Sequence, residues 1–289
     1  MGKADLLLKV TKAEEAACWY ADVLGWEREA DGEGWAMLRM TGGAYALLMG
    51  EKGTHACHAA EGARSVEPGG RFYLPAPAEP GGLDGLEARV RGAGVRCSDE
   101  SEPGCWRTLT VHTPEGYRAA YWQELFPGED EIVALFEGGP KELETVLADL
   151  DEAQLDWTAA AGGWSIRQQV LHVVDLELAA LHKLKFALAS REPGREYRSP
   201  GFSQDDWAEG MRYADRPIGT EAALFRLVRE HVLSVCRHVP GALARSVVTA
   251  GGGEESAGRL MKQMAGHANV HLRRIAEIRT LHGCPPARG

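Results

Sequence analysis

The first 125 residues contain two copies of one short pattern, in which a strand and a helix are followed by three strands. In the first copy we expect a helix that ends at Gly25, spanning 12–25, and strands at 5–10, 26–31, 35–40 and 44–50. After a connector at 51–69, we expect a second helix at 81–94 and strands at 70–77, 95–101, 106–112 and 117–125. This repetition predicts a pseudo-symmetric α+β domain and argues against a doubly wound sheet.

The sequence changes at Pro140 to helical periodicity. Apolar residues recur every three or four positions in four stretches, as expected for helices with one buried face. We predict helices that begin at Pro140, at Ser165 with a capping box to Gln168, at Thr220 and at Ser256. A long crossover at 190–219 separates the second helix from the third. This arrangement predicts an all-α four-helix bundle.

The length of 289 residues suits two domains. We therefore divide the chain into an α+β domain at 1–128, a linker at 129–139 and a helical bundle at 140–289.

Composition excludes several classes of partner. Lys and Arg number 32 against 42 Asp and Glu, which gives a formal net charge of −10 and argues against nucleic-acid binding. No apolar run is long enough to span a bilayer, and no export signal is visible. The six cysteines lack paired spacing, which is typical of reduced thiols. We expect a cytoplasmic protein with a small-molecule substrate, and a homodimer stays open.

Three histidines of the predicted bundle form a candidate metal site. His267 and His271 are four residues apart on the apolar stripe of the fourth helix, so both imidazoles should point into the bundle. His172 lies on the second helix, with Gln168 and Asp175 on the same face. Facing helices of a bundle can bind a metal through such side chains, and three ligands leave an open position. Core histidines with hydrogen-bond partners have the same spacing, so spacing alone leaves both readings open.

The other histidines and the cysteines carry weaker signals. His231 and His238 share a face of the third helix, where packing is the favoured role. His55 and His58 lie in the connector, and we do not expect them to bind metal. No C-x-x-C pair is present, so we expect no redox pair and no cysteine nucleophile.

The N-terminal part resembles the vicinal oxygen chelate superfamily, the glyoxalase and bleomycin-resistance fold. The likeness is carried by WYADVLGW at 19–26 and by the turn TPEGY at 113–117. Metal-binding members place ligands on the first and last strands of each module. Here the first opening strand, 5–10, has no His, and the second opening strand reads Arg71–Leu74. The last strand has Ala120 where a ligand Glu is usual. The resemblance implies a metal-free binding domain. Its candidate aromatic pocket residues are Trp35, Tyr73, Trp106, Tyr121 and Trp122.

The C-terminal part resembles the DinB-like (YfiT-type) superfamily over about residues 140–282. The likeness is carried by Trp164 and Ser165 with VLHVVD at 170–175, and by GHANVHLRRI at 266–275. It implies a four-helix bundle in which His172, His267 and His271 bind a divalent metal, Zn or Ni. Several members are similar to thiol S-transferases that use bacillithiol or mycothiol, and others to mycothiol-dependent isomerases. Arg274 departs from the family, which often has Gln there.

These observations predict a metal-dependent enzyme, a thiol S-transferase or a hydrolase that acts on a small electrophilic molecule, with the N-terminal domain binding or positioning the ligand. A low-molecular-weight thiol is a candidate second cofactor. Asp175 is the candidate catalytic residue, either as a base or as an acceptor that orients His172; a helix-surface carboxylate is the alternative. Two other functions remain open: a protein that sequesters an antibiotic or metabolite, and a natural-product tailoring isomerase or cyclase.

Overall fold

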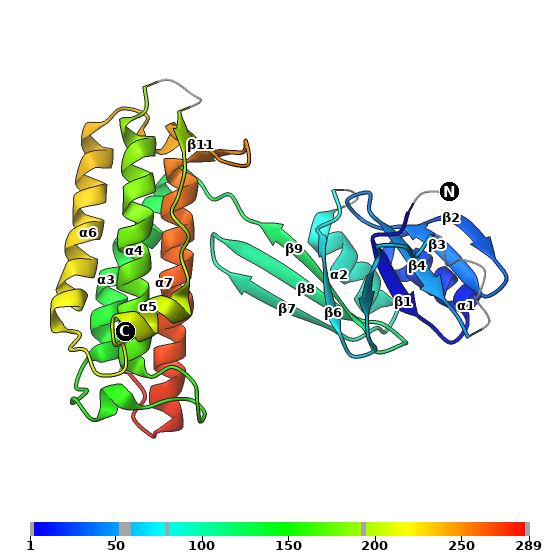
Figure 1. Ribbon diagram of the computed structural model, residues 1–289, viewed down its shortest axis with the longest axis horizontal. Coiled ribbons are helices and arrows are strands. Elements are labelled where there is room, and N and C mark those ends of the chain that lie inside the picture. Colours follow the sequence, from blue (N-terminus) through cyan, green and yellow to red (C-terminus); the bar gives the residue numbers. More distant parts are fainter. Residues whose placement is uncertain (1–2, 52–58, 79–80, 192–194, 287–289) are drawn as a thin grey trace. The chain divides into compact units, whose positions relative to one another are not determined.

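The computed structural model describes residues 3–51, 59–78, 81–191 and 195–286, and the chain divides into two compact units (Figure 1). One unit holds residues 1–101 and 106–125, and the other holds 102–105 and 126–289. The first is built on β-sheets and the second on long helices, which confirms the predicted α+β class with a helical bundle. Within the described residues, no helix has the length and apolar composition needed to cross a membrane.

The first unit contains the two predicted modules. The first module consists of β1 (Leu6–Lys9), α1 (Ala13–Trp19), the π-helical turn η1 (Tyr20–Leu24), β2 (Glu27–Gly32), β3 (Trp35–Arg39) and β4 (Tyr45–Met49). The second consists of β6 (Arg71–Pro75), α2 (Gly82–Gly92), β7 (Cys97–Glu102), β8 (Trp106–His112) and β9 (Arg118–Glu124). Opening and closing strands pair in parallel in both modules, as β1 with β4 and β6 with β9. An additional strand, β5 (Arg64–Val66), extends the first sheet beside β1.

One apolar core serves both modules. It contains buried residues of β1, α1, β6, α2 and β9, so neither module buries its apolar face alone. Tyr20 stacks on Trp26 at a ring separation of 4.6 Å, and the Trp26 indole donates to the Tyr121 hydroxyl at 2.9 Å. Gly25 ends the first helical segment with φ 73°, which only glycine adopts without strain.

The second unit is a four-helix bundle. Its long helices are α3 (Glu129–Leu147), α4 (Ile166–Ala189), α6 (Gly219–His238) and α7 (Ala257–Leu281). Helices α3 and α4 each pack against both α6 and α7, so α3 and α4 lie at opposite corners of the bundle (Figure 1). The smaller elements are η3 (Gln154–Asp156), β10 (Glu196–Tyr197), α5 (Gln204–Gly210), η4 (Ala242–Ala244), β11 (Ser246–Thr249) and β12 (Glu254–Ser256).

Two of the predicted helix starts are confirmed. Ser165 and Gln168 form the expected capping box at the start of α4, and the Ser256 hydroxyl accepts the Arg259 N–H at the start of α7. The start at Thr220 is wrong, because α6 begins at Gly219 and no side chain caps it.

The predicted linker at 129–139 is also wrong, because these residues form the first half of α3. The reason is an apolar stripe that continues across the proline: Ile132, Phe136, Gly139, Leu143 and Val146 are all buried. Pro140 therefore lies inside a helix and not at its start.

A side chain from another helix compensates for the proline. Pro140 has no N–H, so the Phe136 carbonyl four residues earlier loses its helical partner. Arg229 of α6 replaces that partner, because its Nη1 donates to the Phe136 oxygen at 3.0 Å. Gly139 provides the room, since a Cβ there would lie 2.0 Å from the same nitrogen. The sequence Gly139-Pro140 thus fits a helix only beside this arginine.

Candidate metal centre

The three predicted histidines meet in the bundle. Nε2 of His267 lies 3.0 Å from Nε2 of His172 and 3.1 Å from Nε2 of His271. Their ligand atoms all lie within 4.8 Å of one another. His172 comes from α4 and the other two from adjacent turns of α7, which packs against α4. His172 and His271 are buried and His267 is half-buried, so the group faces the bundle interior with one accessible edge.

A buried amide sets the tautomer of His271. The Gln169 side-chain oxygen lies 2.5 Å from Nδ1 of His271. An amide oxygen only accepts, so Nδ1 carries the ring proton and Nε2 presents its lone pair to the other two rings. This is the arrangement in which an outer partner orients a metal-binding imidazole. Gln169 was missed from the sequence, although it lies three residues before His172 and therefore on the same side of α4.

Burial and nearby cations keep the three rings neutral. Burial is the main cause that lowers the pKa of each ring, to about 4 for His267 and about 3 for His271. The pKa of His172 is lowered as well, mainly by burial, although the Asp175 carboxylate opposes the shift. The positive charge of Arg274, the residue that departs from the family pattern, acts in the same direction on all three rings. Neutral imidazoles are the form that binds metal.

The donor set fits a divalent ion. Two nitrogens that share an ion at about 2.0–2.1 Å lie roughly 2.9–3.4 Å apart, depending on the angle between them. The separations of 3.0 and 3.1 Å fall in this range. Within the described residues, Nδ1 of His172 is buried without a hydrogen-bond partner, and Nε2 of the same ring faces Nε2 of His267. Three imidazole ligands suit Zn²⁺ or Ni²⁺.

Asp175 does not orient His172 through a direct hydrogen bond. Its Oδ2 accepts from the Tyr213 hydroxyl at 2.5 Å and lies 3.5 Å from an Arg216 nitrogen. Asp175 is itself buried, which excludes the alternative of a solvated surface carboxylate. The carboxylate predicted to act on the triad instead joins α4 to the segment before α6.

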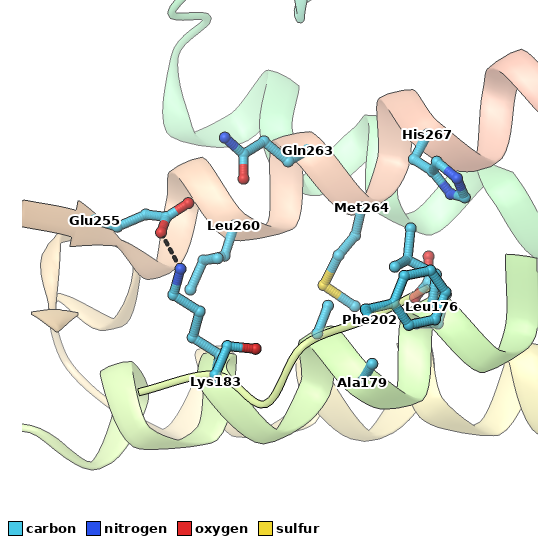
Figure 2. Close-up of a pocket in the computed structure, with 12 residues that line it drawn as sticks. Leu176, Ala179, Lys183, Phe202, Glu255, Leu260, Gln263, Met264 and His267 are labelled. Atoms are coloured by element: carbon cyan, nitrogen blue, oxygen red, sulfur yellow. Dashed lines mark hydrogen bonds and ion pairs between the residues drawn. The ribbon is translucent and has the colours of Figure 1, made fainter. Parts of the chain in front are cut away.

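A pocket of about 340 Å³ adjoins the triad at His267 (Figure 2). Its apolar walls are formed by side chains of α4, α7 and the crossover before α5, namely Leu176, Ala179, Leu260, Met264 and Phe202. A substrate in this pocket would therefore lie against apolar side chains with one end at a metal ligand.

Two carboxylates line this pocket, and Glu177 is the more deeply buried of them. Its side chain is 2% exposed, and Oε1 accepts from Nη2 of Arg229 at 2.6 Å. Oε2 is buried and has no hydrogen-bond partner among the residues that the structure describes. Burial raises the pKa of Glu177, and Arg229 opposes this. A buried carboxylate with one unpaired oxygen is costly, which is more typical of functional sites than of packing.

The remaining candidates lie elsewhere. His231 and His238 are exposed on α6 and do not join the triad, and His55 and His58 lie outside the described residues. In the first unit, a smaller pocket of about 210 Å³ is bounded by β1, the β3–β4 turn and β6. Of the aromatic candidates it contains Tyr73, whereas Tyr121 is fully buried core.

Replacing Gln169 with Leu is expected to lower the metal affinity about 10–100-fold, the usual cost of losing an outer partner of a ligating histidine. Competition with a chelating dye measures this. Gln168→Leu is the matched control, because Gln168 belongs to the capping box: it should cost about 1 kcal/mol of stability and leave the metal affinity unchanged. Equal affinities in both variants would refute the role given to Gln169.

A family model and several sequence relatives match the helical unit. A model of the DinB superfamily matches residues 135–275. A candidate metal-dependent hydrolase of Oceanobacillus iheyensis is 27% identical over 150 residues, which are 52% of this chain and 84% of that protein. A candidate metal-dependent hydrolase of Bacillus mycoides is 34% identical over 80 residues, which are 28% of this chain. This chain spans only 44% of the length of that Bacillus relative.

Solved structures resemble each unit separately. YfiT from Bacillus subtilis, described as a candidate metal-dependent hydrolase with a four-helix bundle, has a TM-score of 0.47 at 18% identity and covers 54% of this chain and 87% of its own. A lactoylglutathione lyase from Agrobacterium tumefaciens has a TM-score of 0.34 at 16% identity and covers 42% of this chain and 91% of its own. By the match of its own sequence to the family model, the helical part of this chain, residues 135–275, belongs to the DinB superfamily.

Proposed function

We propose that the helical unit is the catalytic part of a metal-dependent enzyme that adds water or a low-molecular-weight thiol to a small electrophilic molecule. The observation that carries this proposal is the convergence of His172, His267 and His271 beside a pocket. With water as the nucleophile the enzyme is a hydrolase, and with a thiol it is an S-transferase. The names of the sequence relatives favour the former, and the residue pattern at 164–175 and 266–275 favours the latter.

In this proposal His172, His267 and His271 hold the ion, with Gln169 fixing the orientation of His271. A divalent ion in such a site lowers the pKa of water or a thiol enough to make a nucleophile available near neutral pH. The apolar walls of the pocket exclude bulk water from the substrate.

We assign proton transfer to Glu177 in place of Asp175. Glu177 lines the pocket and its Oε2 has no hydrogen-bond partner among the described residues, whereas both the Tyr213 hydroxyl and Arg216 already contact the Asp175 carboxylate. Arg229 holds Oε1 of Glu177 and leaves Oε2 to receive the proton of the nucleophile as the new bond forms. The same group can return this proton to the leaving group. Asp175 becomes a positioning residue that ties α4 to Tyr213.

Glu177→Gln is expected to lower kcat about 10²–10⁴-fold, the usual contribution of a positioned base, while the metal content stays at one ion per chain. The assays are hydrolysis of p-nitrophenyl acetate and conjugation of 1-chloro-2,4-dinitrobenzene with added thiols. Metal analysis and circular dichroism on the same samples separate loss of catalysis from loss of the site. A variant with wild-type kcat in the assay that the enzyme catalyses would remove Glu177 from the mechanism.

Activity is expected to depend on the ion and on no cysteine of the chain. Chelation should abolish turnover in these assays, and added Zn²⁺ or Ni²⁺ should restore it. A variant with all six cysteines replaced by Ser should retain most activity if its circular dichroism matches that of the wild type. Turnover that survives chelation and disappears with one cysteine would indicate a covalent mechanism and contradict the proposal.

The pocket of the first unit supports a second candidate function, capture of a small molecule without turnover. This pocket lies between strands of the two modules, and Tyr73, 60% exposed, contributes to it. Binding of a small molecule that is lost on Tyr73→Ala, with no turnover of that molecule by the metal-loaded wild type, would favour capture. In the leading proposal the first unit binds or positions the ligand for the helical unit.

We also propose a reducing, cytoplasmic location. Four cysteines in the described part of the chain, Cys18, Cys97, Cys236 and Cys284, are free thiols, as is typical of proteins in reducing compartments.

A further inference from the structure

The pocket beside the triad has a charged end. Lys183 of α4 and Glu255 of β12 form an ion pair there, and His267 lies at the opposite end (Figure 2). Both side chains are mostly buried, with Lys183 20% and Glu255 12% exposed. Leu260 and Met264 lie along α7 between the two ends. The pocket therefore offers metal ligation at one end, apolar contact in the middle and two opposite charges at the other end.

The two charged groups have unused hydrogen-bonding capacity. A lysine ammonium has three N–H donors, and a carboxylate has about four acceptor positions. Among the described residues, Lys183 donates to Glu255 and neither group has another hydrogen-bond partner. An ion pair at one end of an apolar pocket is costly to desolvate unless more hydrogen bonds compensate it. A ligand that supplies both a donor and an acceptor would provide them.

Helix geometry gives the length of the molecule that fits. Leu176 and Lys183 on α4 both line the pocket and are seven residues apart, as are Leu260 and His267 on α7. At 1.5 Å per residue, both helices extend along the pocket for about 10 Å. An extended chain of about eight carbon atoms can therefore connect the two ends.

We propose that the pocket binds an elongated molecule whose far end is an α-amino acid group, with its carboxylate on Lys183 and its ammonium on Glu255. A ligand end with a single charge would leave an uncompensated charge in an apolar pocket, whereas a zwitterionic end keeps the four charges balanced. This assignment names a substrate class for the proposed function and rests on it.

Four hydroxamates with the same eight-carbon chain test the far end on the Zn-loaded full-length protein. The hydroxamate head binds the metal, and the tail is a methyl group, a carboxylate, an ammonium or an α-ammonium carboxylate. By isothermal titration calorimetry, the zwitterionic probe should bind at least about tenfold tighter than the methyl probe. The proposal is overturned if the methyl probe or either singly charged probe binds as tightly as the zwitterion.

Variants connect this preference to the ion pair. Lys183→Met and Glu255→Gln should each abolish the tenfold advantage, while the methyl probe binds as before and so reports an intact pocket. Lys185→Met is the matched control, because Lys185 is exposed on the same helix, and it should change nothing. An advantage that survives both pocket variants would also overturn the assignment.

A second probe series separates this assignment from the proposed function. The compounds 2-aminooctanoate, octanoate and octylamine lack the hydroxamate, and ligand-observed NMR can rank their binding. If the metal centre is absent, the hydroxamates lose their anchor, but 2-aminooctanoate should still bind more tightly than the other two in the wild type and in His267→Ala. The reverse order would refute the amino acid end whatever the fate of the metal.

Discussion

Replacing His271 with Ala should abolish stoichiometric binding of Zn²⁺ or Ni²⁺, and His172→Ala and His267→Ala should do the same. The three Nε2 atoms are the only donors that converge at this point in the described part of the chain, so each substitution removes a third of the ligand set. The loss should exceed the roughly 10–100-fold cost of removing an outer partner. Metal analysis of purified protein, followed by competition with a chelating dye, measures it.

The matched control is His231→Ala, which removes an exposed histidine of the neighbouring α6. This variant should keep one ion per chain with wild-type affinity. If His267→Ala and His271→Ala both retained wild-type metal content, the triad would be three core histidines and the proposed function would fail.

The second large effect concerns stability. Arg229→Met should lower the free energy of unfolding of the helical unit by about 3–5 kcal/mol, the usual cost of breaking a buried ion pair by removing one partner. Arg229 is fully buried, pairs with Glu177 at 2.6 Å and donates to the Phe136 carbonyl. It also lies over the ring of Phe225 at 4.3 Å. Urea unfolding followed by the helical circular dichroism signal measures the change.

A double variant tests the origin of that cost. Glu177→Leu combined with Arg229→Met removes both charges, so it should be more stable than Arg229→Met alone. It should still be less stable than the wild type, because the Phe136 carbonyl stays without its donor. Arg226→Met, on an exposed position of the same helix, should change stability by less than about 0.5 kcal/mol. If Arg229→Met proved as stable as that control, the buried pair would make no net contribution.

Local patterns were sufficient for most of the fold. The strand-like runs and the Gly-containing turns between them located both modules, because turn residues act within a few positions of the chain. The capping residues Ser165 and Ser256 located two helix starts, since caps act within one turn. The start of α3 could not be found this way. Gly139 and Pro140 are locally unfavourable in a helix, and the arginine that compensates for them lies 93 residues from the carbonyl it contacts.

Local patterns also located part of the candidate site, whereas the rest depended on contacts between helices. His267 and His271 could be paired because i and i+4 share a helix face, and His172 was a candidate from its place on the second helix. The family resemblance then identified the three as one ligand set. Choosing between Asp175 and Glu177 needed the packing around α4. Asp175 and Glu177 are two positions apart, which is about 200° around a helix, so the two carboxylates face different neighbours. Nearly every position from 166 to 175 is buried, and periodicity therefore does not identify which side of α4 faces the pocket.

The contact of Arg229 with the Phe136 carbonyl has a consequence for the order of folding. In an isolated α3, Gly138 and Gly139 would each cost about 1 kcal/mol and Pro140 about 3 kcal/mol relative to alanine. Without α6, this segment has no partner for the freed carbonyl, and its helical conformation is unstable. The helix that comes first in the bundle sequence is therefore expected to become continuous only after α6, which is synthesised some 80 residues later, has docked against it.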